Sequence, residues 1–239
     1  MPFAQESLEF LGANVLDEQL FIVTPYLKNG NARAYIASNP GCDRILMTQQ
    51  IILGLGYLHS VKVVHGDLKA VNVLIDDASN AVLCDFGLAR IKADADSQTN
   101  AMSLPSVAGS RNWMAPERLR GESPRAPSDV YAFGLTMYEV CSLRLLSKLD
   151  LKFYAQIYTG EIPLSEVAAQ DFLLLVGDQN VRPKRPTKEE ASQLTDSIWK
   201  LADMCWQGQA SKRPDATYIG RVLEGIKQTL VCVFLFIFA

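Results

Sequence analysis

The chain has 239 residues, of which 49% are hydrophobic and 21% are charged. This composition supports a packed core in one large domain or two small ones, and it argues against a wholly disordered chain. The net charge of −3 argues against a general nucleic-acid-binding protein, whose surface should be basic, so we expect no nucleic-acid partner.

Cysteine and histidine usage bears on the compartment. The five cysteines are odd in number and form no CxxC pair, and His59 and His65 are the only histidines, so a zinc site is poorly supported. Glu6 and Glu9 lie where a secretory signal would be basic. We therefore expect reduced thiols in a cytoplasmic protein, with the nucleus as the alternative.

The first third of the chain predicts two strands followed by two helices. Apolar runs at 10–15 and 20–24 flank an acidic turn, which is typical of short strands. A short helix is expected around 31–38, and a longer helix from about 43 to 60, where apolar residues recur at helical spacing.

A second pair of strands follows, at 73–75 and 82–84, joined by a turn that begins at Asp76 and Asp77. A hairpin here would fix the spacing of the residues just before and just after it. The polar, unpatterned segment 91–105 predicts a mobile loop.

The second half of the chain predicts three helices, around 130–141, 194–205 and 219–226, from apolar residues repeating at helical spacing. The run 230–239 has no charged residue, but a membrane-spanning helix needs about 20 apolar residues. We expect a docked terminal segment or a faulty gene end rather than a membrane anchor. The pattern as a whole predicts a mostly helical domain with a small β portion.

Five short motifs occur in an order that resembles the C-terminal lobe of a protein kinase, in the tyrosine-kinase-like group of Ser/Thr kinases. They are His65-x-Asp67-Leu68-Lys69-x-x-Asn72, Asp85-Phe86-Gly87, Ala115-Pro116-Glu117, Asp129-Val130-Tyr131-Ala132-Phe133-Gly134 and Arg213-Pro214-Asp215.

The resemblance covers about residues 9–228 and implies an α+β, protein-kinase-like fold. It divides the chain into a remnant of the kinase N-terminal lobe with its hinge (1–27), the helical C-terminal lobe (28–228) and an apolar tail (229–239).

The resemblance also implies residue roles in phosphoryl transfer. Asp67 would be the catalytic base, and Lys69 would neutralise charge on the moving phosphoryl group. Asn72 and Asp85 would bind Mg²⁺ through hard oxygen ligands. The structural alternatives are turn-capping roles for Asp67, Asn72 and Asp85 and a surface position for Lys69.

ATP is the nucleotide that the resemblance implies. Thr24 would lie at the back of the hinge, Tyr26 and Leu27 would offer backbone groups to the adenine, and Leu74 would form the apolar floor beneath it. The alternative for these residues is ordinary core packing.

Four further residues would support this site by resemblance. Glu117 and Arg213 would form a buried ion pair, and Asp129 would accept backbone hydrogen bonds from the loop that starts at His65. Ser110 would place a hydroxyl near the base; a loop serine bonded to its own backbone is an equal alternative.

Two departures from the family pattern stand out. Gly66 occupies a position where many kinases have arginine, which normally pairs with a phosphate on the activation loop. No lysine or arginine precedes Lys28, so the Gly-rich loop and the strand lysine that clamp the phosphates are missing.

We therefore expect a protein kinase domain that phosphorylates Ser/Thr in a protein substrate. The alternatives are an inactive kinase-like scaffold that binds a partner protein, and a truncated gene product.

Overall fold

The computed structural model describes residues 11–16, 19–85, 90–91, 110–142, 162–187 and 191–237. Its strands are β1 (Gly12–Leu16), β2 (Gln19–Val23), β3 (Val63–Val64), β4 (Val73–Ile75), β5 (Ala81–Leu83) and β6 (Arg90–Ile91). Its α-helices are α1 (Ala32–Ser38), α2 (Arg44–Ser60), α3 (Pro116–Leu119), α4 (Ala126–Ser142), α6 (Asp196–Cys205) and α7 (Ala216–Ile237). Short 3₁₀ helices are η2 (Ala70–Asn72), η4 (Arg111–Trp113), η5 (Ala169–Asp171) and η7 (Ala210–Lys212), and η6 (Leu173–Asp178) is a π-helix.

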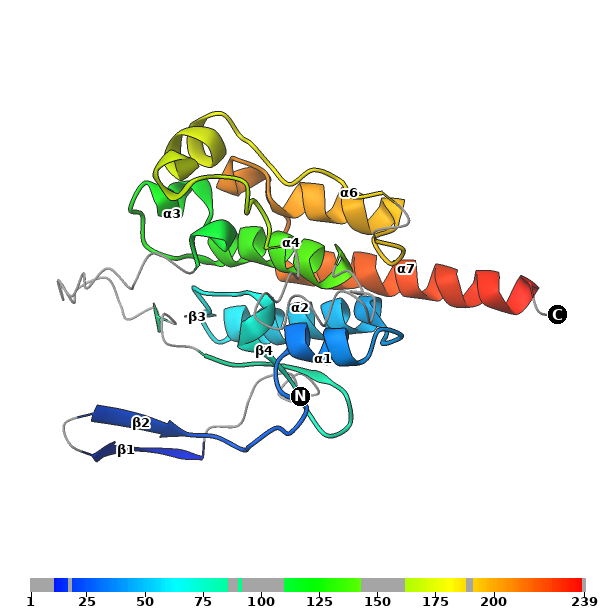
Figure 1. The fold of residues 1–239 in the computed structure, drawn as a ribbon, viewed down its shortest axis with the longest axis horizontal. Helices are drawn as coiled ribbons and strands as arrows, with labels where there is room; N and C mark the ends of the chain where they lie inside the picture. The colour runs from blue at the N-terminus through cyan, green and yellow to red at the C-terminus, as the bar shows by residue number, and fades with distance from the viewer. Residues whose placement is uncertain are drawn as a thin grey trace, which may run out of the picture.

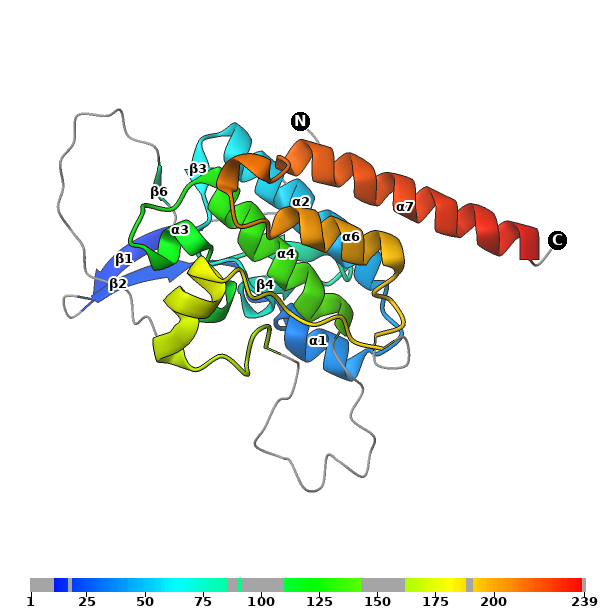
Figure 2. The same ribbon diagram turned by 90° about the horizontal axis from the view of Figure 1, so that it is seen from above.

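Helix α4 forms the centre of the helical body. All its residues from Ser128 to Ser142 are buried, polar ones included. Figures 1 and 2 show α2 and α6 packed beside it, and α7 lying along α2. A helix buried all round must satisfy its polar side chains through neighbouring segments, so the carboxylates of α4 determine how nearby loops are held.

One glycine allows α4 and α6 to approach closely. A Cβ at Gly134 would lie 2.8 Å from Cβ of Cys205 and 3.2 Å from the carbonyl oxygen of Ala202, both on α6. Side chains do not pack at the shorter distance, so the two helices can be this close only with glycine at 134.

Side-chain caps explain where three helices begin. Asn31 accepts a hydrogen bond from the amide of Ala34 at the start of α1, and Asp43 accepts one from Leu46 at the start of α2. Thr195 caps α6 in the same way. Such caps satisfy amides that have no partner inside the helix. The predicted helices 31–38 and 43–60 are confirmed to within one residue.

The strands form three separate two-stranded antiparallel sheets within the described residues: β1 with β2, β3 with β6 and β4 with β5. Figure 1 shows the β1–β2 hairpin standing apart from the helical body. The hairpin predicted at 73–75 and 82–84 is confirmed, with Val73 opposite Leu83. The loop predicted at 91–105 lies outside the described residues except for Ile91, which pairs with Val63 in β3–β6.

The three predicted downstream helices are confirmed as α4, α6 and α7. The π-helix η6 was not predicted, because the sequence around it shows no helical repeat. Helix α7 continues through the predicted boundary at 229 as far as Ile237, and both views show its C-terminal end extending beyond the other elements. No helix in the described residues is long and apolar enough to cross a membrane. The predicted fold class, α+β and mostly helical, is confirmed.

Candidate active site

The loop from His65 to Lys69, which connects β3 to η2, is held by a buried carboxylate of α4. Asp129, 1% exposed, accepts hydrogen bonds from the backbone amides of His65 (2.9 Å) and Gly66 (2.8 Å). Its Oδ2 also lies 2.8 Å from Nε2 of His59, at the end of α2. The predicted role of Asp129 is confirmed, and His59 is a third partner that the motifs did not reveal.

Two residues of this loop have conformations that suit their places. Gly66 has φ +81°, in the left-handed region that glycine adopts without steric cost. The side chain of His65 is buried, and its Nδ1 accepts a hydrogen bond from the amide of Asp67 (3.3 Å). Burial lowers the pKa of His65, which favours the neutral ring that such acceptance requires. The backbone angle therefore favours glycine at position 66, and the hydrogen bond to the amide of Asp67 requires a neutral histidine at position 65.

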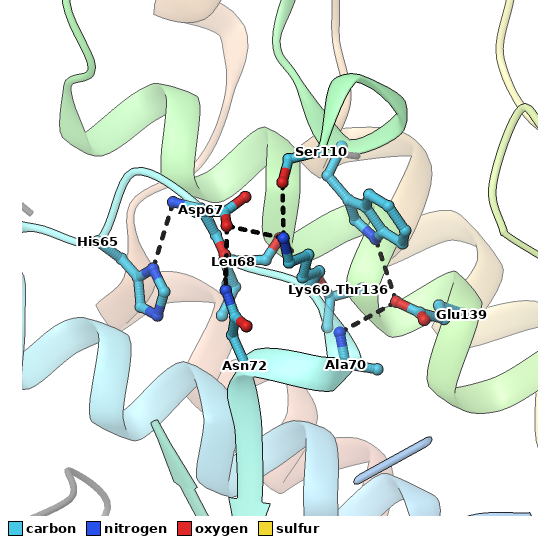
Figure 3. Close-up of polar contacts among 10 residues, drawn as sticks. His65, Asp67, Leu68, Lys69, Ala70, Asn72, Ser110, Thr136 and Glu139 are labelled. Carbon is cyan, nitrogen blue, oxygen red and sulfur yellow. Dashed lines mark hydrogen bonds and ion pairs between the residues drawn. The ribbon is translucent and has the colours of Figure 1, made fainter. Parts of the chain in front are cut away.

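Asp67, Lys69 and Ser110 meet in one hydrogen-bonded group (Figure 3). Nζ of Lys69 lies 2.8 Å from Oδ2 of Asp67 and 2.6 Å from Oγ of Ser110. Lys69 has extended backbone, with φ −165° and ψ 162°, which places its side chain on the same side of the loop as that of Asp67. Both side chains are 15% exposed, so they are positioned by the protein and still open to a substrate.

Asn72 is fixed against Asp67. Its amide nitrogen donates to the backbone carbonyl of Asp67 (2.8 Å) and to its Oδ2 (3.1 Å). The amide oxygen is then the atom of Asn72 that can bind a cation. The carbonyl of Asn72 accepts from the amide of Cys84 (3.0 Å), so the β4–β5 hairpin ties it to the residue just before Asp85.

Asp85 is exposed and has φ +59°. Aspartate tolerates this left-handed conformation better than most residues. An exposed carboxylate and an amide oxygen fit Mg²⁺, which binds proteins through few groups and keeps waters or phosphates as its other ligands. The part of the chain that the structure describes contains no cluster of three His, Cys, Asp or Glu side chains that could hold a metal ion. Phe86 and Gly87 lie outside the described residues.

The residues expected to hold adenine lie elsewhere, after β2 and on β4. Thr24 is exposed and the side chain of Tyr26 is 90% exposed, whereas Leu27 and Leu74 are half-buried. Leu74 forms an isolated bridge with Asn31, next to α1. Ordinary core packing does not describe Thr24 or Tyr26, and the nucleotide-binding role of all four residues stays a prediction.

The predicted ion pair between Glu117 and Arg213 is present. Nη1 and Nη2 of Arg213 donate to Oε1 (2.6 Å) and Oε2 (2.8 Å) of Glu117, and the arginine side chain is fully buried. Burial by itself would raise the pKa of Glu117, but the hydrogen bonds and charge of Arg213 hold that pKa below its usual value. This bidentate pair ties α3 to the segment that precedes α7.

One important carboxylate was missed in the sequence. Glu139 of α4 is 0% exposed and contacts the backbone of Ala70, the indole of Trp113 and the guanidinium of Arg33. The available signal was a lone charged residue in the second half of a predicted helix. Such a residue needs buried partners, although the sequence does not say which.

Comparison with known proteins gives a consistent result. A family model described as protein tyrosine and serine/threonine kinase matches residues 4–223. Serine/threonine-protein kinase CTR1 of Arabidopsis thaliana is 30% identical over 93% of this chain and 25% of its own length. A dual serine/threonine and tyrosine protein kinase of Apis mellifera is 35% identical over 78% of this chain and 17% of its own length.

Serine/threonine-protein kinase STY17 of Arabidopsis thaliana is 27% identical over 91% of this chain. The chain spans 34% of the length of that relative, and as little as 12% of a putative kinase/receptor of Acanthamoeba polyphaga mimivirus. The family match over most of the chain agrees with the grouping of Asp67, Lys69 and Asn72 and with the supporting ion pair. This chain belongs to the protein kinase family, in the tyrosine-kinase-like group whose members include Ser/Thr and dual-specificity kinases.

Proposed function

We propose that this domain transfers the terminal phosphoryl group of ATP to serine or threonine hydroxyls of a protein substrate. The observation that carries the proposal is the contact of Lys69 with both Asp67 and Ser110, beside Asn72. This group joins a base, a cation and a metal-binding amide in one partly open site, and phosphoryl transfer depends mostly on such positioning and charge.

Asp67 acts as the base. Its carboxylate orients the substrate hydroxyl and accepts the hydroxyl proton as the oxygen bonds to phosphorus and the bond to the leaving phosphate oxygen breaks. Lys69 stabilises negative charge on the transferred group, and its contact with Ser110 keeps it there. Asn72 and Asp85 would hold Mg²⁺, which when bound would neutralise charge on the ATP phosphates.

Thr24, Tyr26, Leu27 and Leu74 would hold the adenine in this proposal. The substrate is a protein, and no nucleic-acid partner is expected from the acidic net charge. A cytoplasmic or nuclear location is proposed from the cysteine pattern alone.

A second candidate function is a kinase-like scaffold that binds a partner protein without turnover. The observation that favours it is that residues 1–27 contain no lysine or arginine that could pair with the ATP phosphates. Removal of one preorganised electrostatic group typically costs about 10²–10³ in rate.

Thermal melting with and without Mg-ATP separates the two functions. A ligand that binds only the folded state stabilises it by about 2.7 kcal/mol at a concentration of 100 Kd. A Mg-dependent rise in Tm that Asp85→Asn removes, followed by phosphate transfer that Asp67→Asn abolishes, is the result expected for a kinase. A cooperative melt that Mg-ATP does not shift, with no transfer, would overturn the enzymatic proposal and favour the scaffold.

A further inference from the structure

Arg111 directly follows Ser110, whose hydroxyl contacts Lys69 (Figure 3). Consecutive Cα atoms lie about 3.8 Å apart, so the backbone of Arg111 lies at the edge of the group formed by Asp67, Lys69 and Ser110. Its Nη1 donates a hydrogen bond to the backbone carbonyl of Ala169 (3.1 Å), which lies at the surface. A cation is therefore anchored beside the place where the proposed function puts the hydroxyl that receives the phosphoryl group.

A second contact fixes the same short helix, η4. Nδ2 of Asn112 donates to the backbone carbonyl of Pro163 (2.8 Å), so two successive residues reach the segment 163–169, which leads into η5. The side chain of Arg111 is thus already ordered by the protein. A side chain that is ordered before binding loses less conformational entropy when a ligand arrives.

The charge of Arg111 is not neutralised within the described residues. Its partner there is an uncharged carbonyl, and no described carboxylate forms an ion pair with it, although Glu166 and Asp171 lie close to Ala169 in the sequence. A guanidinium has several N–H donors, and the contact with Ala169 uses one of them. The others can bind a carboxylate or a phosphate through two parallel hydrogen bonds.

We propose that Arg111 is a specificity-determining residue, which selects protein substrates that carry an acidic side chain close to the phosphorylated serine or threonine. The inference rests on the proposed function, which places the acceptor hydroxyl at Asp67. An extended peptide advances about 3.3 Å per residue, so the acidic side chain should lie within about three residues of the acceptor. Aspartate, glutamate and a previously phosphorylated residue share the anionic oxygens that this site would bind.

Phosphotransfer to short synthetic peptides tests this selection. Each peptide has one acceptor serine among alanines and carries aspartate, phosphoserine or lysine at a single position, which is moved along both sides of the acceptor. We expect kcat/KM for the best acidic peptide to exceed that for the matching lysine peptide by about fivefold or more, and added salt to reduce the ratio. The aspartate and phosphoserine series show whether carboxylate or phosphate is the better ligand. Equal use of acidic and lysine peptides at every position would overturn the proposal.

Charge variants identify the residue responsible. Arg111→Gln should remove the preference, Arg111→Lys should keep most of it, and Arg111→Glu should favour the lysine peptides. The matched control is Arg221→Gln, which removes an exposed arginine from α7 and should keep the parent ratio. A ratio measured on one preparation does not depend on the folded fraction, so a loss of stability in a variant does not affect it.

A purely structural role for Arg111 predicts a different result. If its contact with Ala169 only held η4 in place, Arg111→Gln would slow the use of all peptides by the same factor. An unchanged ratio between acidic and lysine peptides in Arg111→Gln would therefore overturn the proposal.

Binding can be measured without turnover through the ¹H–¹⁵N signal of the Nε–H group of Arg111, assigned through Arg111→Gln. We expect the acidic peptide, with alanine in place of the acceptor serine, to shift this signal and the lysine peptide to leave it unchanged. This shift in a parent chain that phosphorylates neither the peptides nor dephosphorylated casein would contradict the proposed function and support the acidic site. An Arg111 signal that the acidic peptide does not shift would overturn the acidic site, whether or not the chain transfers phosphate.

Discussion

The predicted catalytic loop, from His65 to Lys69, and the predicted hinge segment around Tyr26 differ in how the rest of the chain holds them. Buried carboxylates of α4 hold the loop, because Asp129 accepts from His65 and Gly66 and Glu139 accepts from Ala70. The hinge follows a two-stranded hairpin that stands apart from the helical body, and its Tyr26 is 90% exposed. An isolated two-stranded hairpin is marginally stable in water.

This difference indicates that the half of the candidate site proposed to move the phosphoryl group is preorganised by the helical core. The half expected to hold adenine gains little from that core within the described residues. Variants in the two regions should therefore differ sharply in their effect on stability.

The largest effect on stability is expected at Asp129. Asp129→Ala leaves two backbone amides and His59 without their buried acceptor, and loss of one member of a buried charged network costs about 3–5 kcal/mol. Urea unfolding measures this change. Asp178→Ala is the control, because its ion pair with Arg120 is about half exposed and should contribute less than about 1 kcal/mol. Equal losses at the two positions would contradict the central role of α4.

The next effect is expected on rate. Lys69→Ala removes the cation between Asp67 and Ser110, so phosphate transfer should fall about 10²–10³-fold. Its free energy of unfolding should also fall, by about 1–3 kcal/mol, because both side chains are only 15% exposed and Asp67 loses a charged partner. Lys28→Ala, at an exposed pair with Asp77, should leave the rate unchanged. A Lys69→Ala variant as fast as the parent would remove the electrostatic role assigned to this lysine.

A pH-dependent effect is expected at Glu117. Glu117→Ala leaves the fully buried Arg213 without its carboxylate and should cost about 3 kcal/mol at pH 7. The pKa of Glu117 is lower in the folded protein than in the unfolded chain, so the folded state binds fewer protons than the unfolded chain.

The stabilisation is therefore complete above the unfolded pKa of about 4.3 and is lost as the pH falls through the folded value. The difference in stability between parent and variant, measured by denaturant melts, should therefore shrink progressively as the pH falls below about 4.3. A difference that stays constant from pH 7 to pH 3 would show that the stabilisation is not linked to the Glu117 proton.

The smallest effect is expected at the hinge. Tyr26→Ala removes a side chain that contacts little of the protein, so the free energy of unfolding should stay within about 0.5 kcal/mol of the parent value. If Tyr26 lends only its backbone to adenine, the Mg-ATP shift in Tm should also persist. A loss of more than about 2 kcal/mol would show that the hinge is packed as tightly as the catalytic loop.

Local patterns in the sequence predicted helices α1, α2, α4, α6 and α7 and the β4–β5 hairpin, and the resemblance to kinase motifs predicted the grouping of Asp67, Lys69 and Asn72. Each of these depends on residues near one another in the chain or on a short motif. The sequence did not predict that Glu139 joins Ala70 to Trp113, because those contacts depend on how α4 passes between two loops. The same holds for His59, whose partner Asp129 is 70 residues away.

Gly66 shows a different limit. In the motif, Gly66 stands at a position where many kinases have arginine. In the structure its φ is +81°, a backbone conformation that glycine adopts without steric cost. The amide of this glycine donates to Asp129, a contact that a motif does not record.

Native-state hydrogen exchange tests the comparison most directly. The amides of His65, Gly66 and Ala70 should exchange with an opening free energy close to that of global unfolding, because all three donate to buried carboxylates of α4. The amides of the β1–β2 hairpin should open at a much lower free energy. Equal protection of the two regions, or faster exchange in the catalytic loop, would contradict the conclusion that α4 holds the phosphoryl-transfer half of the site in place.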